Sequence, residues 1–193
     1  MDFFTNLLTG ITLSDVLITV IALLVAAFML YFPYYWCKRR GESEDAYGLR
    51  WFMGEGAWRG TVLATVLTLV PLTFMSYYWP RFLGVGGPFN PPLWVVINLL
   101  SGGLAAAFIE EIFYRGWMQT LCVRKWGTYF GITLTSAVFA VSHLFIEPSW
   151  LRLMTFFPGL VMGFLRHRYG SVMPAIVYHA VCNVWAVWWM PRV

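Results

Sequence analysis

Charged side chains are scarce in this chain. Only 11% of its 193 residues are Asp, Glu, Lys or Arg, whereas a typical soluble domain has about 25%. Hydrophobic residues make up 60% of the sequence and aromatic residues 19%. This composition excludes an ordinary soluble domain and indicates an integral membrane protein, whose aromatic rings collect at the membrane interfaces.

Cysteine is also scarce. The three cysteines are an odd number, and none of them forms a CxxC pair. A disulfide framework and a cysteine-based zinc site are therefore not expected. The net charge of +4 is small and falls mostly in short loops, so we expect no nucleic-acid partner.

Long apolar runs fill most of the chain. A membrane-spanning helix needs about 20 residues, so the sequence predicts an all-α fold, a polytopic membrane helix bundle with about six transmembrane helices. The predicted spans are residues 14–37, 57–79, 93–123, 128–146, 151–165 and 172–190. We divide the chain into residues 1–92, with the first two helices and their loops, and residues 93–190, a transmembrane core.

The basic residues between these spans predict the orientation of the bundle. Six spans alternate direction, so nine Lys and Arg residues fall on one side and three on the other. The first set is Lys38, Arg39, Arg40, Arg50, Arg59, Arg124, Lys125, Arg166 and Arg168; the second is Arg81, Arg152 and Arg192. By the positive-inside rule the first side is cytoplasmic, and both termini lie on the other side.

One predicted span carries three ionisable residues within six positions: Glu110, Glu111 and Arg115. A charge at the centre of a membrane helix costs at least about 2.5–3.5 kcal/mol, so such residues usually face the bundle interior and have a function. Glu111 and Arg115 have the i,i+4 spacing of a helical ion pair, which would keep Glu111 ionised. Glu110 points about 100° away on the helix and is free to exchange a proton.

Other polar residues lie inside later spans. If the helices are straight, Glu110 and His143 lie at about the same depth on an antiparallel hairpin, and His179 and Asn183 lie within a turn or two of that level. Phe139 shares a helix face with His143, and His179 shares one with Asn183. We expect these residues to form one site with Glu110 and Glu111, with Arg115 and Phe139 as structural support.

These residues would make a complete hydrolytic site without a covalent nucleophile. Glu110 and His143 would activate a water molecule, and His179 and Asn183 would donate hydrogen bonds to the oxyanion. No cofactor is required by this scheme. A second interpretation stays open, because Glu110, His143 and His179 also form a possible ligand set for catalytic zinc.

Three ordered motifs resemble those of the CPBP family, which contains type II CAAX prenyl endopeptidases and bacteriocin-processing enzymes and is also called the Abi family. They are EEIFYR at 110–115, FAVSH at 139–143 and HAVCN at 179–183. The resemblance implies an intramembrane endopeptidase of the glutamate type, often labelled a metalloprotease. Its first glutamate and second-motif histidine would activate water, and its last histidine and asparagine would bind the oxyanion.

The resemblance also implies the kind of substrate and the membrane in which it is cut. The substrate would be a membrane-anchored or lipidated protein or peptide cut near its C-terminus, in the lipid bilayer of a prokaryotic cell membrane. Small members of the family include proteases that process the C-terminal anchors of surface proteins. The alternative function is a non-catalytic membrane binding protein or a bacteriocin self-immunity protein.

Overall fold

The computed structural model describes residues 12–84, 87–88, 90–145 and 148–189, and for Trp79, Arg81 and Leu83 only the backbone. Arg192 and the end of the last predicted span lie outside the described residues. The long helices are α2 (Leu13–Arg40), α3 (Ala57–Leu83), α4 (Leu93–Glu111), α6 (Thr128–Ser142), α8 (Phe156–Tyr169) and α9 (Met173–Trp189). Shorter elements are η1 (Glu44–Tyr47), η2 (Ile112–Met118), α5 (Gln119–Trp126), η3 (His143–Phe145) and α7 (Trp150–Leu153). The predicted all-α membrane bundle is confirmed.

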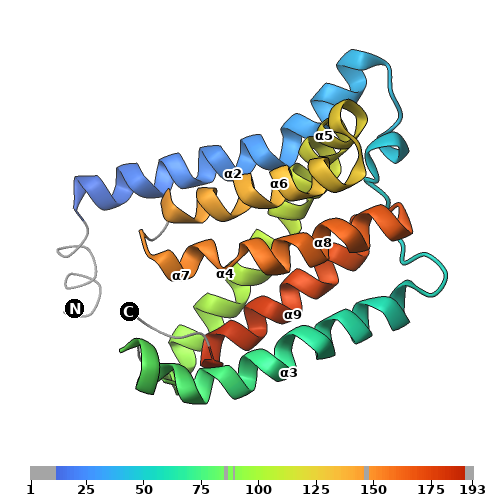
Figure 1. Ribbon diagram of the computed structural model, residues 1–193. Coiled ribbons are helices and arrows are strands. Elements are labelled where there is room, and N and C mark those ends of the chain that lie inside the picture. The colour runs from blue at the N-terminus through green and yellow to red at the C-terminus, as the bar shows by residue number, and fades with distance from the viewer. Residues whose placement is uncertain (1–11, 85–86, 89, 146–147, 190–193) are drawn as a thin grey trace.

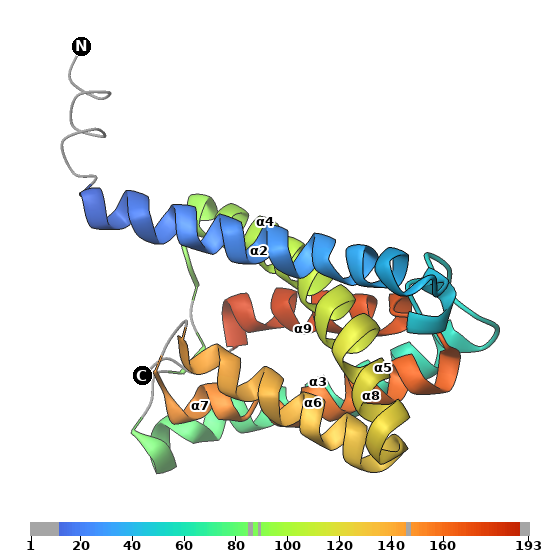
Figure 2. The ribbon, with the colours of Figure 1, turned by 90° about the horizontal axis from the view of Figure 1, so that it is seen from above.

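Helix α9 lies at the centre of the bundle. It packs against α3, α4 and α8, while α6 packs against both α5 and α8. Figure 1 shows α2 and α3 on opposite sides of this group, and Figure 2 shows α4 crossing the other helices obliquely. The crossing helix and the central helix carry Glu110, Glu111, His179 and Asn183, so their contact brings two of the motifs together.

Large apolar side chains cover much of the outer surface, as lipid contact requires. By length and composition, four of the described segments can cross a membrane: Leu13–Arg40, Ala57–Tyr78, Leu93–Trp126 and Thr128–Phe145. The remaining two predicted spans are shorter helical segments. The fifth is interrupted between α7 and α8, and its helix extends to Tyr169 rather than ending at residue 165. Pro158 lies in the first turn of α8, where a missing backbone N–H removes no helical hydrogen bond.

The polar loop after α2 is folded against the ends of the helices. The Trp36 indole donates a hydrogen bond to the Tyr47 hydroxyl, at 3.1 Å, and the backbone N–H of Val172 donates to the Gly48 carbonyl, at 2.8 Å. Arg124 donates a hydrogen bond to Glu42, and this bond holds the pKa of Glu42 below its usual value. The loop therefore ties α2 to the ends of α5 and α9 at one end of the bundle.

Candidate active site

Glu111 is the last residue of α4 and is completely buried. The Arg115 Nε lies 3.3 Å from the Glu111 Oε2, and Arg115 is also completely buried. The expected ion pair is therefore present. It is a contact between charges without aligned hydrogen-bond geometry, because neither of these two atoms has a hydrogen-bond partner among the described residues.

The ion pair bridges a change of helix type. Residues Ile112–Met118 form a π-helix, and the backbone N–H of Gln119 bonds to the Tyr114 carbonyl five residues earlier. Such π-helical turns are frequent at functional sites. Here the wider turn follows the two glutamates directly, so Arg115 approaches Glu111 from a π-helical segment and not from a regular α-helix.

Glu111 also holds His179. The His179 Nδ1 lies 3.0 Å from the Glu111 Oε1 and is within hydrogen-bond distance. A carboxylate only accepts hydrogen bonds, so Nδ1 carries a proton when Glu111 is ionised. The other ring nitrogen, Nε2, is turned toward Glu110, whose Oε2 lies 3.9 Å away. His179 therefore stands between the two glutamates.

His143 is oriented by its own helix. Its Nδ1 lies 2.9 Å from the Phe139 carbonyl oxygen, which can only accept a hydrogen bond. Nδ1 therefore carries a proton, and in the neutral ring Nε2 presents a lone pair. A neutral imidazole with a free Nε2 is suited to act as a base.

The Phe139 ring lies between the two histidines. Its centroid is 4.5 Å from that of His143 and 5.8 Å from that of His179. The Arg115 guanidinium lies over the same ring, 5.0 Å from its centroid, within cation–π distance. Phe139 thus packs against both histidines and the buried cation.

Asn183 is held by α4. Its Nδ2 donates a hydrogen bond to the Gly103 carbonyl, at 2.8 Å. An amide NH₂ has two hydrogens, so one remains for another acceptor. The close approach depends on glycine, because a Cβ at Gly103 would lie 3.2 Å from the Asn183 Cβ.

The neighbouring glycines of α4 offer a matched test of this contact. We expect Gly103→Ala to displace Asn183 and lower activity several-fold or more, because the added methyl group lies closer to Asn183 than ordinary packing allows. Gly102→Ala is the control, since a Cβ there would meet nothing within 4 Å. Both variants should be compared by cleavage rate and by thermal stability in detergent. Equal activity of the two variants would contradict a role for the position of Asn183.

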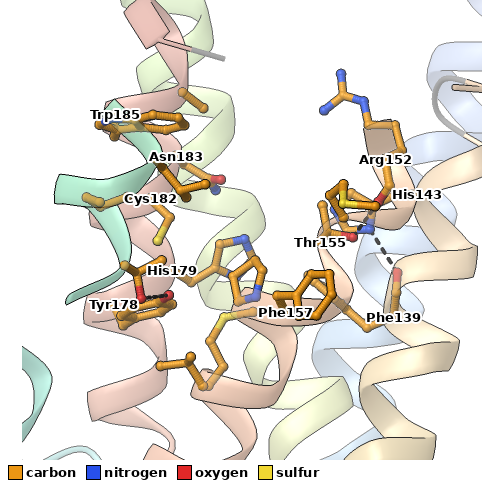
Figure 3. Close-up of a pocket in the computed structure, with 18 of the residues that line it drawn as sticks. Phe139, His143, Arg152, Thr155, Phe157, Tyr178, His179, Cys182, Asn183 and Trp185 are labelled. Carbon is orange, nitrogen blue, oxygen red and sulfur yellow. Dashed lines mark hydrogen bonds between the residues drawn. The ribbon is translucent and has the colours of Figure 1, made fainter. Parts of the chain in front are cut away.

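A cavity of about 480 Å³ lies beside these residues (Figure 3). Its walls come from α3, α6, α7, α8, α9 and the turn before α8, and they include His143, His179 and Asn183. Figure 3 shows His143 and His179 on opposite sides of Phe139, with Asn183 further along α9. Glu110 is not among the described residues that line the cavity. Most of the other lining residues are apolar, including Leu72, Met75, Phe157, Val161 and Trp185.

The contribution of α3 to the wall of the cavity was not expected from the sequence. Thr68 and Thr73 on α3 accept hydrogen bonds from the Tyr178 hydroxyl, at 2.9 Å, and from the Trp185 indole, at 2.8 Å. Each threonine hydroxyl donates to a backbone carbonyl of its own helix. These two bonds fix the wall formed by α3 against the helix that carries His179.

The structure therefore places the predicted residues in two connected groups. Glu110, Glu111, Arg115 and His179 form a buried network, and Phe139 links it to His143. His143 bonds to Phe139 rather than to Glu110, so the expected water-activating pair is not in direct contact in this structure. The bond between Glu111 and His179 was missed, because the sequence offered Arg115 as the only local partner for Glu111.

The zinc interpretation does not fit this arrangement. Among the described residues, no group of three or more His, Cys, Asp and Glu side chains is placed to hold a metal ion. Glu110, His143 and His179 therefore do not form the three-ligand set that catalytic zinc needs.

The bundle and its buried network define a class: a multi-pass membrane protein with a polar site enclosed by its helices. Residues 92–185 match the family model described as Rce1-like, type II CAAX prenyl endopeptidase. No curated protein and no solved structure gives a significant match to the chain. The matched part contains every candidate site residue, and it belongs to the CPBP family of CAAX proteases.

The match confirms the family that the three motifs predicted. At the level of the family, the matched part is that of a CAAX-type intramembrane protease, and this family implies a membrane-protein substrate in the bilayer. The matched residues begin just before α4 and end within α9, so the first two long helices lie outside them.

Proposed function

We propose that the chain is a glutamate-type intramembrane endopeptidase that cuts a membrane-anchored protein or peptide near its C-terminus. The observation that carries this proposal is the buried network of Glu110, Glu111 and His179 beside an apolar cavity. A scissile peptide bond in this cavity would lie close to both histidines and to Asn183. The apolar walls suit a substrate segment that comes from the membrane.

In this proposal a water molecule attacks the substrate carbonyl. Glu110 accepts the proton of the water, and His143, with Nε2 unprotonated, assists as a second base. The tetrahedral oxyanion receives hydrogen bonds from His179 and from the second N–H of Asn183. The proton taken from the water then passes to the leaving amine, so the base is restored.

Glu111 acts through His179 in this scheme. Its carboxylate accepts a hydrogen bond from Nδ1 and fixes the orientation of the ring, and His179 donates to the oxyanion from Nε2 when both ring nitrogens carry a proton. Arg115 balances the charge of the carboxylate on the side of Glu111 away from the histidine. Glu111 and Arg115 are therefore positioning residues, while Glu110, His143, His179 and Asn183 contact the reacting atoms.

The oxyanion site can be tested at Asn183. We expect Asn183→Ala to lower the cleavage rate by about 10²–10³-fold with little change in KM, because the lost hydrogen bond forms fully only in the transition state. Asn98→Ala is the matched control, since Asn98 is an exposed residue of α4. A large rise in KM with an unchanged maximal rate would instead assign Asn183 to substrate binding.

We further propose that catalysis needs no metal ion. Active, purified protein should contain well under one zinc per chain, measured by mass spectrometry, and extensive dialysis against a chelator should leave its activity unchanged. About one zinc per chain, lost together with activity in His179→Ala, would overturn this proposal and restore zinc as the activator of the water.

A further inference from the structure

The lining of the cavity carries a permanent positive charge. Among the described residues that line it, Arg152 is the only Lys or Arg, and none is Asp or Glu. The rest of the polar lining consists of the two histidines, Asn183 and uncharged hydroxyl, thiol and indole groups. A ligand that fills the cavity displaces water from the guanidinium, and a charge that loses its water has to be paired. The cavity therefore favours a ligand that brings a negative group to Arg152.

The short helix α7 fixes the backbone of Arg152 in the cavity wall. Ser149 caps this helix by accepting a hydrogen bond from the backbone N–H of Leu151, at 3.3 Å, and Leu151 is itself buried. The Thr155 hydroxyl donates to the Arg152 carbonyl, at 2.7 Å. Helix α7 packs against α6 and against η3, which begins with His143. Arg152 is therefore held beside the turn that carries one of the two histidines.

Helix α7 turns its charge inward. Trp150 and Leu153 are exposed and are not among the described lining residues, whereas Arg152 is half-buried and lines the cavity. An arginine that only reached for the lipid headgroups would be an exposed residue of this helix. Figure 3 shows Arg152 on the same wall as His143 and across the cavity from Asn183. Charged residues of a membrane bundle that face a cavity usually mark a substrate site.

We propose that Arg152 binds the free C-terminal carboxylate of the substrate. A planar guanidinium holds a carboxylate through two parallel hydrogen bonds. Its five N–H donors also allow Arg152 to keep its interactions within the chain. An unmodified peptide chain ends in a carboxylate whatever its side chains are, so this contact is compatible with an apolar segment in the rest of the cavity.

The proposal rests on the proposed protease function and makes it more specific. The substrate chain would end inside the cavity, a short segment beyond the scissile bond, and would not pass through it. Arg152 is then a substrate-binding residue that selects chains with a free C-terminus, and the histidines and Asn183 act on the peptide bond.

Binding of apolar peptides that differ only at the C-terminus tests this proposal. The probe is a mixture of dansylated hexapeptides of Ala, Leu and Val, made once as the free acid and once as the C-terminal amide. Each form is titrated by fluorescence into the purified full chain in detergent, with Glu110→Gln present throughout so that no peptide is cut. Arg152→Gln removes the charge, and Arg152→Lys keeps the charge without the planar fork. Arg168→Gln is the matched control, because Arg168 is an exposed residue in the last turn of α8.

We expect the free acid to bind about tenfold more tightly than the amide, or better, to the chains that keep Arg152, including Arg168→Gln. Arg152→Gln should abolish this difference without weakening the amide, and Arg152→Lys should keep part of it. Unchanged binding of the amide shows that the variant is folded.

Three results would overturn the proposal: no preference for the acid in chains with Arg152, a preference that survives Arg152→Gln, or an equal loss of both peptides in Arg152→Gln. The titration needs no catalysis. A preference that depends on Arg152, in a chain that cuts no peptide when Glu110 is restored, would therefore refute the protease function and leave the carboxylate site in place.

Discussion

Glu110→Gln should lower cleavage by about 10²–10⁴-fold while leaving a folded protein in the membrane. The substitution keeps the size and polarity of the side chain and removes only its ability to accept a proton. Glu110 keeps 17% of its side-chain surface exposed. Glu111 beside it is completely buried, and its two carboxylate oxygens contact Arg115 and His179. Glu110 is therefore the carboxylate that can reach a water molecule.

Glu55→Gln is the matched control, because Glu55 lies exposed in the loop before α3. Both variants should be purified in detergent and compared by single-turnover cleavage and by thermal unfolding. We expect equal unfolding temperatures and a difference only in rate. If Glu110→Gln keeps more than about a tenth of the wild-type turnover, Glu110 is not the base.

Arg115→Ala should destabilise the protein by about 3–5 kcal/mol and lower its yield as well as its activity. The change leaves Glu111 as a buried carboxylate without its cation, and it also removes the guanidinium from the face of Phe139. A variant of this kind loses folded protein because burying an unpaired charge is costly. The measurement is thermal or denaturant unfolding in detergent.

Two further variants separate the scaffold role from catalysis. Arg59→Ala removes an exposed cation and should leave stability unchanged. Adding Glu111→Gln to Arg115→Ala removes the unpaired charge, so it should restore part of the lost stability but not the activity, because His179 then lacks its carboxylate partner. Normal stability of Arg115→Ala with lost activity would place Arg115 in the catalytic step.

The sequence predicted the helical bundle and its polar residues because both depend on local patterns. Apolar runs of sufficient length mark the spans, and ionisable residues inside them are conspicuous. The pairing of Glu111 with Arg115 was also predictable, since the two residues are one helical turn apart. These features need no knowledge of how the helices pack.

The bond between Glu111 and His179 was not predictable in this way. The two residues are 68 positions apart, and only the packing of α9 against α4 joins them. The contact between Gly103 and Asn183 was unpredictable for the same reason. Gly103 is a small residue and Asn183 a polar one, but the hydrogen bond between them depends on the crossing of the helices.

Helix irregularities were also not predictable from the sequence. The estimate of the depth of the site residues assumed straight α-helices, whereas residues Ile112–Met118 form a π-helix and the fifth span is divided between α7 and α8.

The cavity wall formed by α3 was missed for another reason. Thr68 and Thr73 are ordinary residues for a membrane helix, and they acquire their role only by facing Tyr178 and Trp185.

The most direct test of the central claim is a comparison of membrane proteins by mass spectrometry in cells that express the wild-type chain, Glu110→Gln or neither. We expect at least one membrane-anchored protein to lose a C-terminal segment only in cells with the wild-type chain, and to keep it in cells with Glu110→Gln at equal abundance. Identical C-termini in all three, with both chains folded in the membrane, would contradict a protease and favour a binding or immunity function.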